Sequence, residues 1–140
     1  MRPIRWLPMG FQVCGSSMEP SYPDGARVRV STWPLALRNP RRGDVVMIRS
    51  PAAPQRMELK RVIGLPTEQV SWNGGAIRIN GARLDEPYAN VAPAPPGDDE
   101  WQDRCLRADE YFVAGDNRLH STDSRRYGPI PRRLITGKLV

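Results

Sequence analysis

The sequence has little of what several common classes of protein require. Its 140 residues include two cysteines and one histidine, without the ligand spacing of a zinc site. Its longest apolar stretch runs from Trp6 to Phe11 and is broken by Pro8 and Gly10. That is far shorter than the ~20 residues of a membrane-spanning helix and too short for a secretory signal. We therefore expect no metal, no cofactor and no transmembrane segment in this chain.

Lysine is almost as scarce as histidine. Nineteen of the 21 basic residues are arginine, and the two lysines are Lys60 and Lys138. A serine hydroxyl becomes a useful nucleophile only when a nearby base takes its proton. The chain has one histidine, so it offers only one candidate for the base of a Ser-His-Asp arrangement. Arginine cannot give up its proton, whereas a desolvated lysine can. A lysine in an apolar setting is therefore the candidate base.

The charge is strongly positive, at +6 with a pI near 10, which would suit nucleic acid or an anionic membrane surface. The arginines are spread along the chain with no run beyond two, so we interpret them as a solvated basic surface and expect no nucleic-acid partner. Residues 1–10 carry Arg2 and Arg5 beside Trp6. We interpret them as a partly ordered N-terminal segment, and the alternative is a peripheral contact with anionic lipid.

Fifteen prolines and twelve glycines predict short strands joined by turns rather than long helices. Alternating or apolar runs predict strands at 11–13, 26–30, 45–48, 57–64 and 111–114, and a short turn and closing strand near the C-terminus. Glycine-rich hairpin signals flank a short strand at 76–79, and loops are expected at 33–40 and 92–100. The predicted fold is mostly β: an antiparallel core spanning 11–140, with a smaller β lobe inserted at about 66–108 and little helix.

The segment Gly15-Ser16-Ser17-Met18-Glu19-Pro20 follows the first predicted strand, so Ser17 sits where a strand ends in a tight turn. Glycine there permits positive φ. Along 57–64, side chains alternate across the strand, so Lys60 shares a face with Val62 and opposes Arg61. If that face is apolar, burial lowers the pKa of Lys60 below its ordinary value. The alternative is an edge-strand lysine with its amine in water.

A densely polar run, 115–128, lies between the last apolar strands. In it Asp123 and Arg125 are two residues apart, and we expect them to pair on one face of an extended segment. His120 is interpreted as a solvent-facing loop residue, and Cys14 and Cys105 have no pattern that would place them together.

Four segments of the chain resemble, in the same order, those of the type I signal peptidases, membrane-surface serine endopeptidases that remove signal peptides from exported proteins. The segments are FQVCGSSMEP, RGDVV, LKRVIGLP and GDNRLHSTDSRRYGPIP. The stretch WNGGAIRINGARLDEPY resembles the hairpin region that lies between the last two. The resemblance covers nearly the whole chain from Phe11 to Lys138. It implies an antiparallel β fold with an inserted β lobe and the removal of signal peptides from preproteins.

The resemblance also implies roles for particular residues. Ser17 matches the nucleophile, Lys60 its general base and Ser121 the serine that orients that base. Asp123 and Arg125 match a supporting charged pair. The implied reaction is acyl transfer through an acyl-enzyme, with specificity for small residues, mostly alanine, at the first and third positions before the cut. For the walls of the substrate pocket we select four apolar residues: Phe11, Val13, Met18 and Leu59.

Some features depart from the family pattern. Family members usually have a spanning helix before the nucleophile, whereas sixteen residues precede Ser17. We expect the anchor to be missing, trimmed or replaced by a peripheral contact at the outer face of the cytoplasmic membrane. Gly15 stands where some relatives have a hydroxyl that serves as second oxyanion donor, and Thr67-Glu68 stands where Gly-Asp is common.

Three alternatives to a signal peptidase remain. One is a specialised maturation protease with a single substrate, and another is a catalytically silent relative that binds peptides or membrane. The third is a self-cleaving repressor domain, which would need its own cleavage segment and usually a DNA-binding helical domain, and neither is evident in the sequence.

Overall fold

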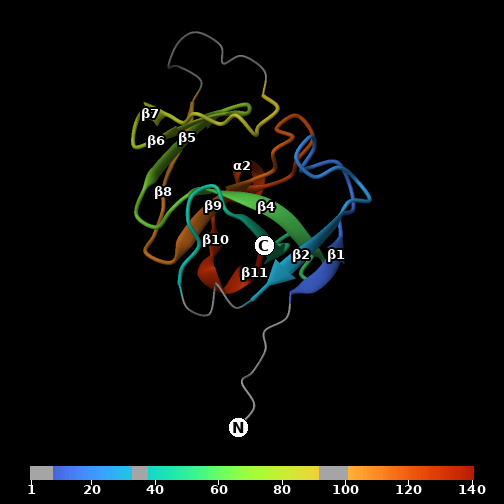
Figure 1. The fold of residues 1–140 in the computed structure, drawn as a ribbon. Helices are drawn as coiled ribbons and strands as arrows, with labels where there is room; N and C mark the ends of the chain where they lie inside the picture. Colours follow the sequence, from blue (N-terminus) through green and yellow to red (C-terminus); the bar gives the residue numbers. More distant parts are fainter. Residues whose placement is uncertain (1–7, 33–37, 92–100) are drawn as a thin grey trace.

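The computed structural model describes residues 8–32, 38–91 and 101–140, and its strands form two antiparallel sheets (Figure 1). The main sheet has seven strands in the order β1-β2-β11-β3-β4-β9-β10, and the smaller one has four in the order β7-β6-β5-β8. The main strands are β1 (Met9–Gln12), β2 (Arg27–Ser31), β3 (Val45–Arg49), β4 (Met57–Gly64), β9 (Glu110–Ala114), β10 (Ile130–Pro131) and β11 (Ile135–Leu139). The smaller sheet contains β5 (Gln69–Asn73), β6 (Ala76–Ile79), β7 (Ala82–Arg83) and β8 (Gln102–Cys105).

The predicted antiparallel fold with a second, smaller sheet is confirmed. All four strands of the smaller sheet lie between β4 and β9 in the sequence, and the limits of the lobe at about 66 and 108 stay a prediction. Strand β4 has the predicted bounds. Strand β1, in contrast, begins at Met9, inside the segment expected to be partly ordered, because Met9 and Gly10 pair with Val30 and Arg29 of β2. Residues 1–7, 33–37 and 92–100, with the predictions made for them, lie outside the described residues.

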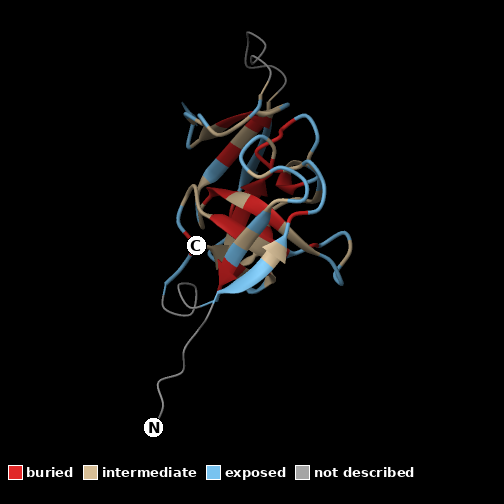
Figure 2. Ribbon diagram, turned by 45° about the vertical axis from the view of Figure 1, so that its right-hand side comes forward, coloured by how far each residue is buried: buried red, intermediate tan, exposed pale blue. Residues whose placement is uncertain are grey.

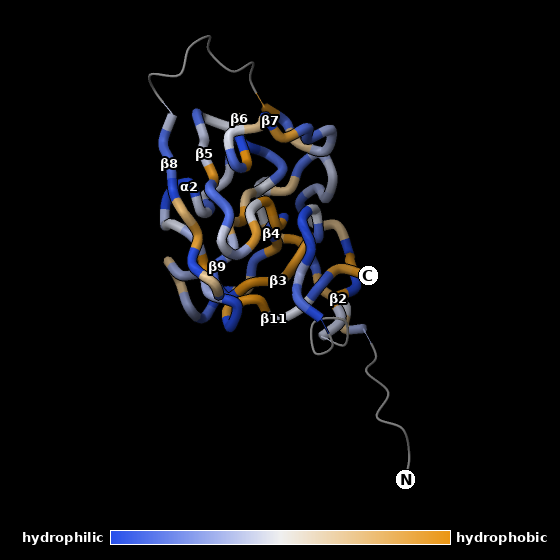
Figure 3. The backbone as a smooth tube through the Cα atoms, turned by 90° about the vertical axis from the view of Figure 1, so that its left-hand side faces the viewer, coloured by the Kyte–Doolittle hydropathy of each residue, from blue (hydrophilic) through white to orange (hydrophobic). Residues whose placement is uncertain are grey.

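Three apolar clusters hold the fold together, and the buried segments run through both sheets (Figure 2). One cluster lies within the main sheet and includes Val46, Val62 and Val113. A second joins the two sheets, with the Trp72 and Phe112 rings 5.1 Å apart between their centroids. Apolar segments of β3, β4 and β9 pass through the middle of the molecule in Figure 3. Burial of side chains at this scale is the main source of stability for such a domain.

The third cluster lies beneath the turn that contains Ser17. It consists of Val13, Met18, Val30, Val45 and Leu59, all at most 6% exposed. Met18 directly follows Ser17 and is only 1% exposed. The side chain next to the candidate nucleophile therefore anchors the turn in the core.

One local prediction was wrong. Asp123 and Arg125 do not pair on an extended segment, because Asp123 is the N-cap of a short helix, α2 (Ser124–Tyr127), and accepts a hydrogen bond from the Arg125 amide. Aspartate is favoured at this position because its carboxylate satisfies amide groups that the first helical turn leaves unpaired. The two side chains still pair, with Arg125 Nε 2.9 Å from Asp123 Oδ1.

The turn at Thr67-Glu68 holds a threonine in the left-handed region of backbone conformation. Thr67 has a φ of 71°, which is strained for a β-branched residue. Glu68 compensates locally, because its carboxylate accepts hydrogen bonds from the Leu65 amide and from two nitrogens of Arg42. The sequence variation at this turn therefore coincides with an ion pair that ties it to the loop before β3.

Candidate active site

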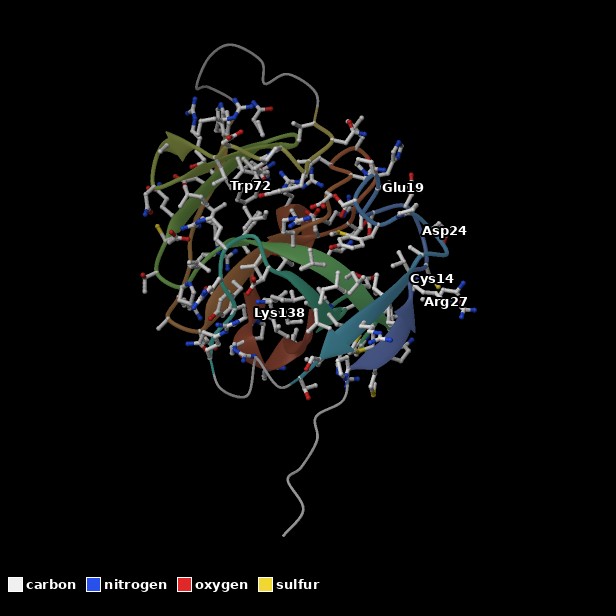
Figure 4. The ribbon with its side chains drawn as sticks, viewed as in Figure 1. Cys14, Glu19, Asp24, Arg27, Trp72 and Lys138 are labelled. Atoms are coloured by element: carbon white, nitrogen blue, oxygen red, sulfur yellow. The ribbon has the colours of Figure 1, made fainter. Side chains whose placement is uncertain are left out.

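The turn that carries Ser17 is fixed from both ends. The Gly15 amide donates to Asp24 Oδ1 over 2.8 Å, with Gly15 at a φ of 92°. On the other side Asn117 donates from its amide to the Ser17 carbonyl over 2.9 Å and from its side chain to the Ser16 carbonyl over 3.0 Å. Cys14, Glu19 and Asp24 lie together at one edge of the molecule in Figure 4, which locates this turn. The Ser17 side chain is thus mounted on a rigid loop.

Lys60 lies in the middle of β4 and is 3% exposed. Burial is the largest influence on its amine and lowers its pKa, while Glu58 and Asp123 partly oppose that shift and Arg125 adds to it. Its Nζ lies 3.2 Å from Ser121 Oγ. Among the described residues no hydrogen bond joins this amine to Ser17 Oγ. The amine is therefore buried and oriented by a hydroxyl rather than by a carboxylate.

Ser121, Asp123 and Arg125 form a relay, that is, a chain of hydrogen bonds that begins at the Lys60 amine. The Ser121 hydroxyl donates to Asp123 Oδ2 over 2.8 Å, so its oxygen is left to accept from Lys60. The Asp123 carboxylate also accepts from the Gly115 amide and from Arg125. Although burial works to raise the pKa of Asp123, the Arg125 hydrogen bonds and charge outweigh it and lower that pKa. Asp123 therefore stays ionised and fixes the direction of the Ser121 hydroxyl.

A cavity of about 430 Å³ opens between β1, β4 and the Ser17 turn. Ser17 and Lys60 both line it, and so do the four residues selected from the sequence for the pocket walls: Phe11, Val13, Met18 and Leu59. His120 and Thr122 also line it, and His120 is exposed as expected. The structure thus brings the candidate nucleophile, the candidate base and the candidate walls to one cavity.

Two residues that position the site were not identified from the sequence. A Cβ on Gly115 would collide with both Ser121 Oγ and the Ser17 carbonyl oxygen, so only glycine lets the chain pass between them directly after β9. Asn117 ties the Ser16 and Ser17 carbonyls to the segment that follows the same strand. Both belong to the segment Gly115-Asp116-Asn117, but their role depends on a loop about a hundred residues earlier and carries no local signal.

The opposite face of β4 carries a charged cluster. Arg61 donates to both carboxylate oxygens of Asp116 over 2.8 and 2.7 Å, and its guanidinium lies 4.0 Å from the centroid of the Tyr88 ring. Asp116 also accepts from the hydroxyl of Ser21, which follows the nucleophile turn, over 2.6 Å. This cluster links β4, the segment after β9, the Ser17 loop and the segment after β7.

Within the described part of the chain, no group of His, Cys, Asp and Glu could hold a metal ion. Cys14 and Cys105 are both free thiols and both exposed. None of the helices in residues 8–32, 38–91 and 101–140 is long and apolar enough to cross a membrane.

The chain is similar to known proteins over most of its length. The model of a family described as signal peptidase, peptidase S26, matches residues 4–140. Signal peptidase I of Leptolyngbya laminosa is 37% identical over 131 residues, which cover 89% of this chain and 63% of that protein. Signal peptidase I V of Bacillus subtilis (strain 168) is 31% identical over 137 residues, which cover 91% and 80%. The chain thus spans less than two thirds of the Leptolyngbya relative.

A solved structure agrees with these matches. A signal peptidase I from Enterococcus faecalis V583 superposes with a TM-score of 0.59 at 31% identity and covers 74% of this chain and 98% of that one. These matches place the chain in the class of serine-type peptidases. Within that class it belongs to the signal peptidase family, peptidase S26.

Proposed function

We propose that the chain is a serine endopeptidase that cleaves signal peptides from exported preproteins by a Ser-Lys dyad. The observation that carries the proposal is the buried Lys60 amine lining the same cavity as Ser17, with its pKa lowered by burial. Neutral Lys60 takes the proton of Ser17, and Oγ attacks the scissile carbonyl. Lys60 then passes the proton to the leaving amine, and water hydrolyses the acyl-enzyme.

The relay behind the amine supports this assignment. The Ser121 oxygen can only accept from Lys60, because its own proton goes to Asp123. A neutral amine that donates to Ser121 keeps its lone pair free for the proton of Ser17. Hydrogen bonds between nucleophile and base commonly tighten when substrate binds. We therefore expect Lys60 Nζ and Ser17 Oγ to come together in the substrate complex.

The tetrahedral intermediate needs a donor for its oxyanion. Among the described residues the Ser17 amide has no hydrogen-bond acceptor, so it is available for this role. One such donor is worth ~3–4 kcal/mol in enzymes of this type. With Gly15 in place of a hydroxyl-bearing residue, a second donor would have to come from the backbone or from another group.

For specificity we propose small residues at the first and third positions before the cut, in an Ala-X-Ala pattern. The support is the apolar wall that Phe11, Val13, Met18 and Leu59 give to the cavity. The partner is then the signal peptide of a preprotein at the outer face of the cytoplasmic membrane, with a peripheral contact to the membrane surface. A specialised maturation protease would use the same chemistry on a single substrate.

The test is cleavage of a model preprotein with an Ala-X-Ala end. We expect Ser17→Ala and Lys60→Met each to lower kcat/KM by at least about 10⁴-fold, with circular dichroism unchanged. Lys138→Met is the matched control, because Lys138 pairs with Asp44 and neither residue lines the cavity. Full activity of Lys60→Met would overturn the dyad. Absence of cleavage by the unaltered protein would favour the silent relative.

A further inference from the structure

A buried ion pair between Arg118 and Glu86 lies outside the chemistry proposed above. The two side chains are 0% and 5% exposed, and the guanidinium donates to both carboxylate oxygens. Neither residue is one of the described residues that line the cavity. A buried pair of charges adds little net stability over apolar side chains of the same size. What the pair holds in place is therefore the better guide to its role.

Arg118 lies three residues before Ser121 and holds the segment that carries it. Its Nε donates to the Gly115 carbonyl over 2.7 Å, and its own carbonyl accepts from Arg125 Nη1 over 2.9 Å. The Gly115 amide in turn donates to Asp123, which also binds Arg125 and Ser121. Arg118 is thus connected to residues on both sides of Ser121, the first member of the relay.

Glu86 belongs to the segment after β7 and reaches the candidate base from a second direction. It accepts a hydrogen bond from the Tyr88 hydroxyl over 2.9 Å. The ring of Tyr88 lies against the guanidinium of Arg61, which is the neighbour of Lys60 in β4. One short segment of the chain therefore contacts both the loop that orients the base and the strand that carries it.

The segment after β7 is also held by bonds that do not depend on this ion pair. Asn90 forms a parallel bridge with Asn117, and its amide and carbonyl bond to the main chain of Asp116 and Arg118. The Gly75 carbonyl accepts from Arg118 Nη1 over 2.9 Å, and a Cβ on Gly75 would collide with the Arg118 side chain. Loss of the charged partner should therefore loosen Arg118 without detaching the segment.

We propose that Glu86 is a positioning residue of the active site: by holding Arg118 it fixes the loop that carries Ser121, and through that hydroxyl it orients the Lys60 amine. The inference rests on the peptidase function proposed above. Glu86 acts on the chemical step rather than on substrate binding, because it is not one of the residues that line the cavity. Its effect reaches the amine through the Ser121 hydroxyl, which bonds to Lys60 Nζ.

The test is a double-mutant cycle on cleavage of the model preprotein. Glu86→Gln keeps the size of the side chain and removes its charge, so we expect kcat to fall by about tenfold or more with KM within about twofold. In a Ser121→Ala background the same substitution should lower kcat by no more than about twofold, because its path to the amine is already broken. A loss by the same factor in both backgrounds, or a change in KM alone, would overturn the proposal.

Glu68→Gln is the matched control. Glu68 also binds both outer nitrogens of an arginine, Arg42, but is not one of the residues that line the cavity, so kcat should stay within about twofold. An equal loss of kcat in Glu68→Gln would mean that any broken ion pair has this effect, and the proposal would fail.

A second variant guards against misfolding of Glu86→Gln. Glu86→Met combined with Arg118→Met leaves no buried charge unpaired, and the bond to the Gly115 carbonyl is lost. This double variant should fold and still lose about tenfold or more in kcat. Full activity would mean that the pair only fills space and would contradict the positioning role.

A readout apart from catalysis uses the scarcity of lysine. With ¹³C at the Cε of lysine, the protein gives two side-chain NMR signals, which Lys60→Met and Lys138→Met assign. Glu86→Gln should move the Lys60 signal in the otherwise unaltered protein but not in Ser121→Ala, whereas Glu68→Gln should move it in neither. This pattern supports the positioning role even if the unaltered protein cleaves nothing, which would count against the proposed function alone. A Lys60 signal that Glu86→Gln leaves in place would overturn the positioning role.

Discussion

Two neighbouring cations on opposite faces of β4, Lys60 and Arg61, have pKa values shifted in opposite directions. Lys60 is 3% exposed and has a hydroxyl, that of Ser121, as its hydrogen-bond partner, and burial lowers its pKa. Arg61 is bound by both oxygens of Asp116. Although burial also works to lower the pKa of Arg61, the hydrogen bonds and charge of Asp116 outweigh it and raise that pKa. One face holds a cation that can become neutral, and the other holds a cation that stays charged.

The difference lies in where the nearest carboxylate is placed. Asp116 contacts Arg61 directly, whereas Asp123 is separated from Lys60 by the Ser121 hydroxyl. A carboxylate in contact would stabilise the charged amine and remove the base. One intervening hydroxyl keeps orientation without full charge compensation. One face of β4 thus carries the candidate base, Lys60, and the other carries a structural ion pair, Arg61 with Asp116. Substitutions on either face test this contrast.

The largest effect is expected from exchanging the type of cation. Lys60→Arg keeps a positive charge that cannot be lost near neutral pH, so we expect kcat/KM on the model preprotein to fall by about 10⁴-fold. The rate of the unaltered protein should rise with pH as Lys60 loses its proton, because only the neutral amine acts as base. The residual rate of Lys60→Arg should lack this rise. The measurement is kcat/KM from pH 5 to 10.

Arg61→Lys is the matched exchange on the other face. It keeps the charge beside Asp116 but loses the bidentate geometry, so we expect activity within about tenfold of the unaltered protein and the same pH profile. If the rate of the unaltered protein is flat from pH 5 to 10, or if Lys60→Arg is active, the chemical role of the Lys60 face is wrong.

A smaller effect, on stability, is expected from Asp116→Asn. It leaves Arg61 without its charged partner and weakens the bond from Ser21, so we expect the free energy of unfolding to fall by about 3 kcal/mol. Urea denaturation followed by tryptophan fluorescence measures it. The control is Asp44→Asn, which removes the partly exposed pair with Lys138 and should cost about 1 kcal/mol or less. Equal losses for the two variants would mean that the Arg61 face is no more structural than a surface pair.

Sequence alternation was enough to predict that Lys60 and Arg61 face opposite ways, because the side-chain period of a strand is two. It could not identify Asp116 as the partner of Arg61, since 55 residues separate them. Gly115 and Asn117 were missed for the same reason, because what they contact lies in the Ser16–Ser17 loop. Local patterns report which side of a strand is apolar but not which distant groups the fold places against it.

The strands also show that local patterns predict an element only where its own sequence is apolar, and not where pairing with a distant strand forms it. Strand β4 was predicted to the residue because apolar residues recur along all of its eight positions, between charged ones. Strand β8 was not predicted, since all four of its residues are exposed; it forms because Gln102–Cys105 pair with β5. The start of β1 at Met9 likewise depends on β2. The helix at 124–127 was missed because Asp123 caps it in a polar run without helical periodicity.

The smallest effect is expected in the stability of Lys60→Met. With a native pKa below the unfolded value, Lys60 binds fewer protons in the native state than in the unfolded chain between those two values, so stability rises with pH in that window. The destabilising contribution is therefore complete below the lowered native pKa and disappears as the pH rises toward the unfolded value near 10.5. Methionine removes it, so we expect a higher Tm for Lys60→Met at pH 6 and a smaller gain at pH 10. Lys138→Met, which removes a partly exposed ion pair, should lower the Tm slightly. A Tm for Lys60→Met below that of the unaltered protein at pH 6 would mean that Lys60 is held as a stabilising cation, as Arg61 is, and the contrast between the two faces would be lost.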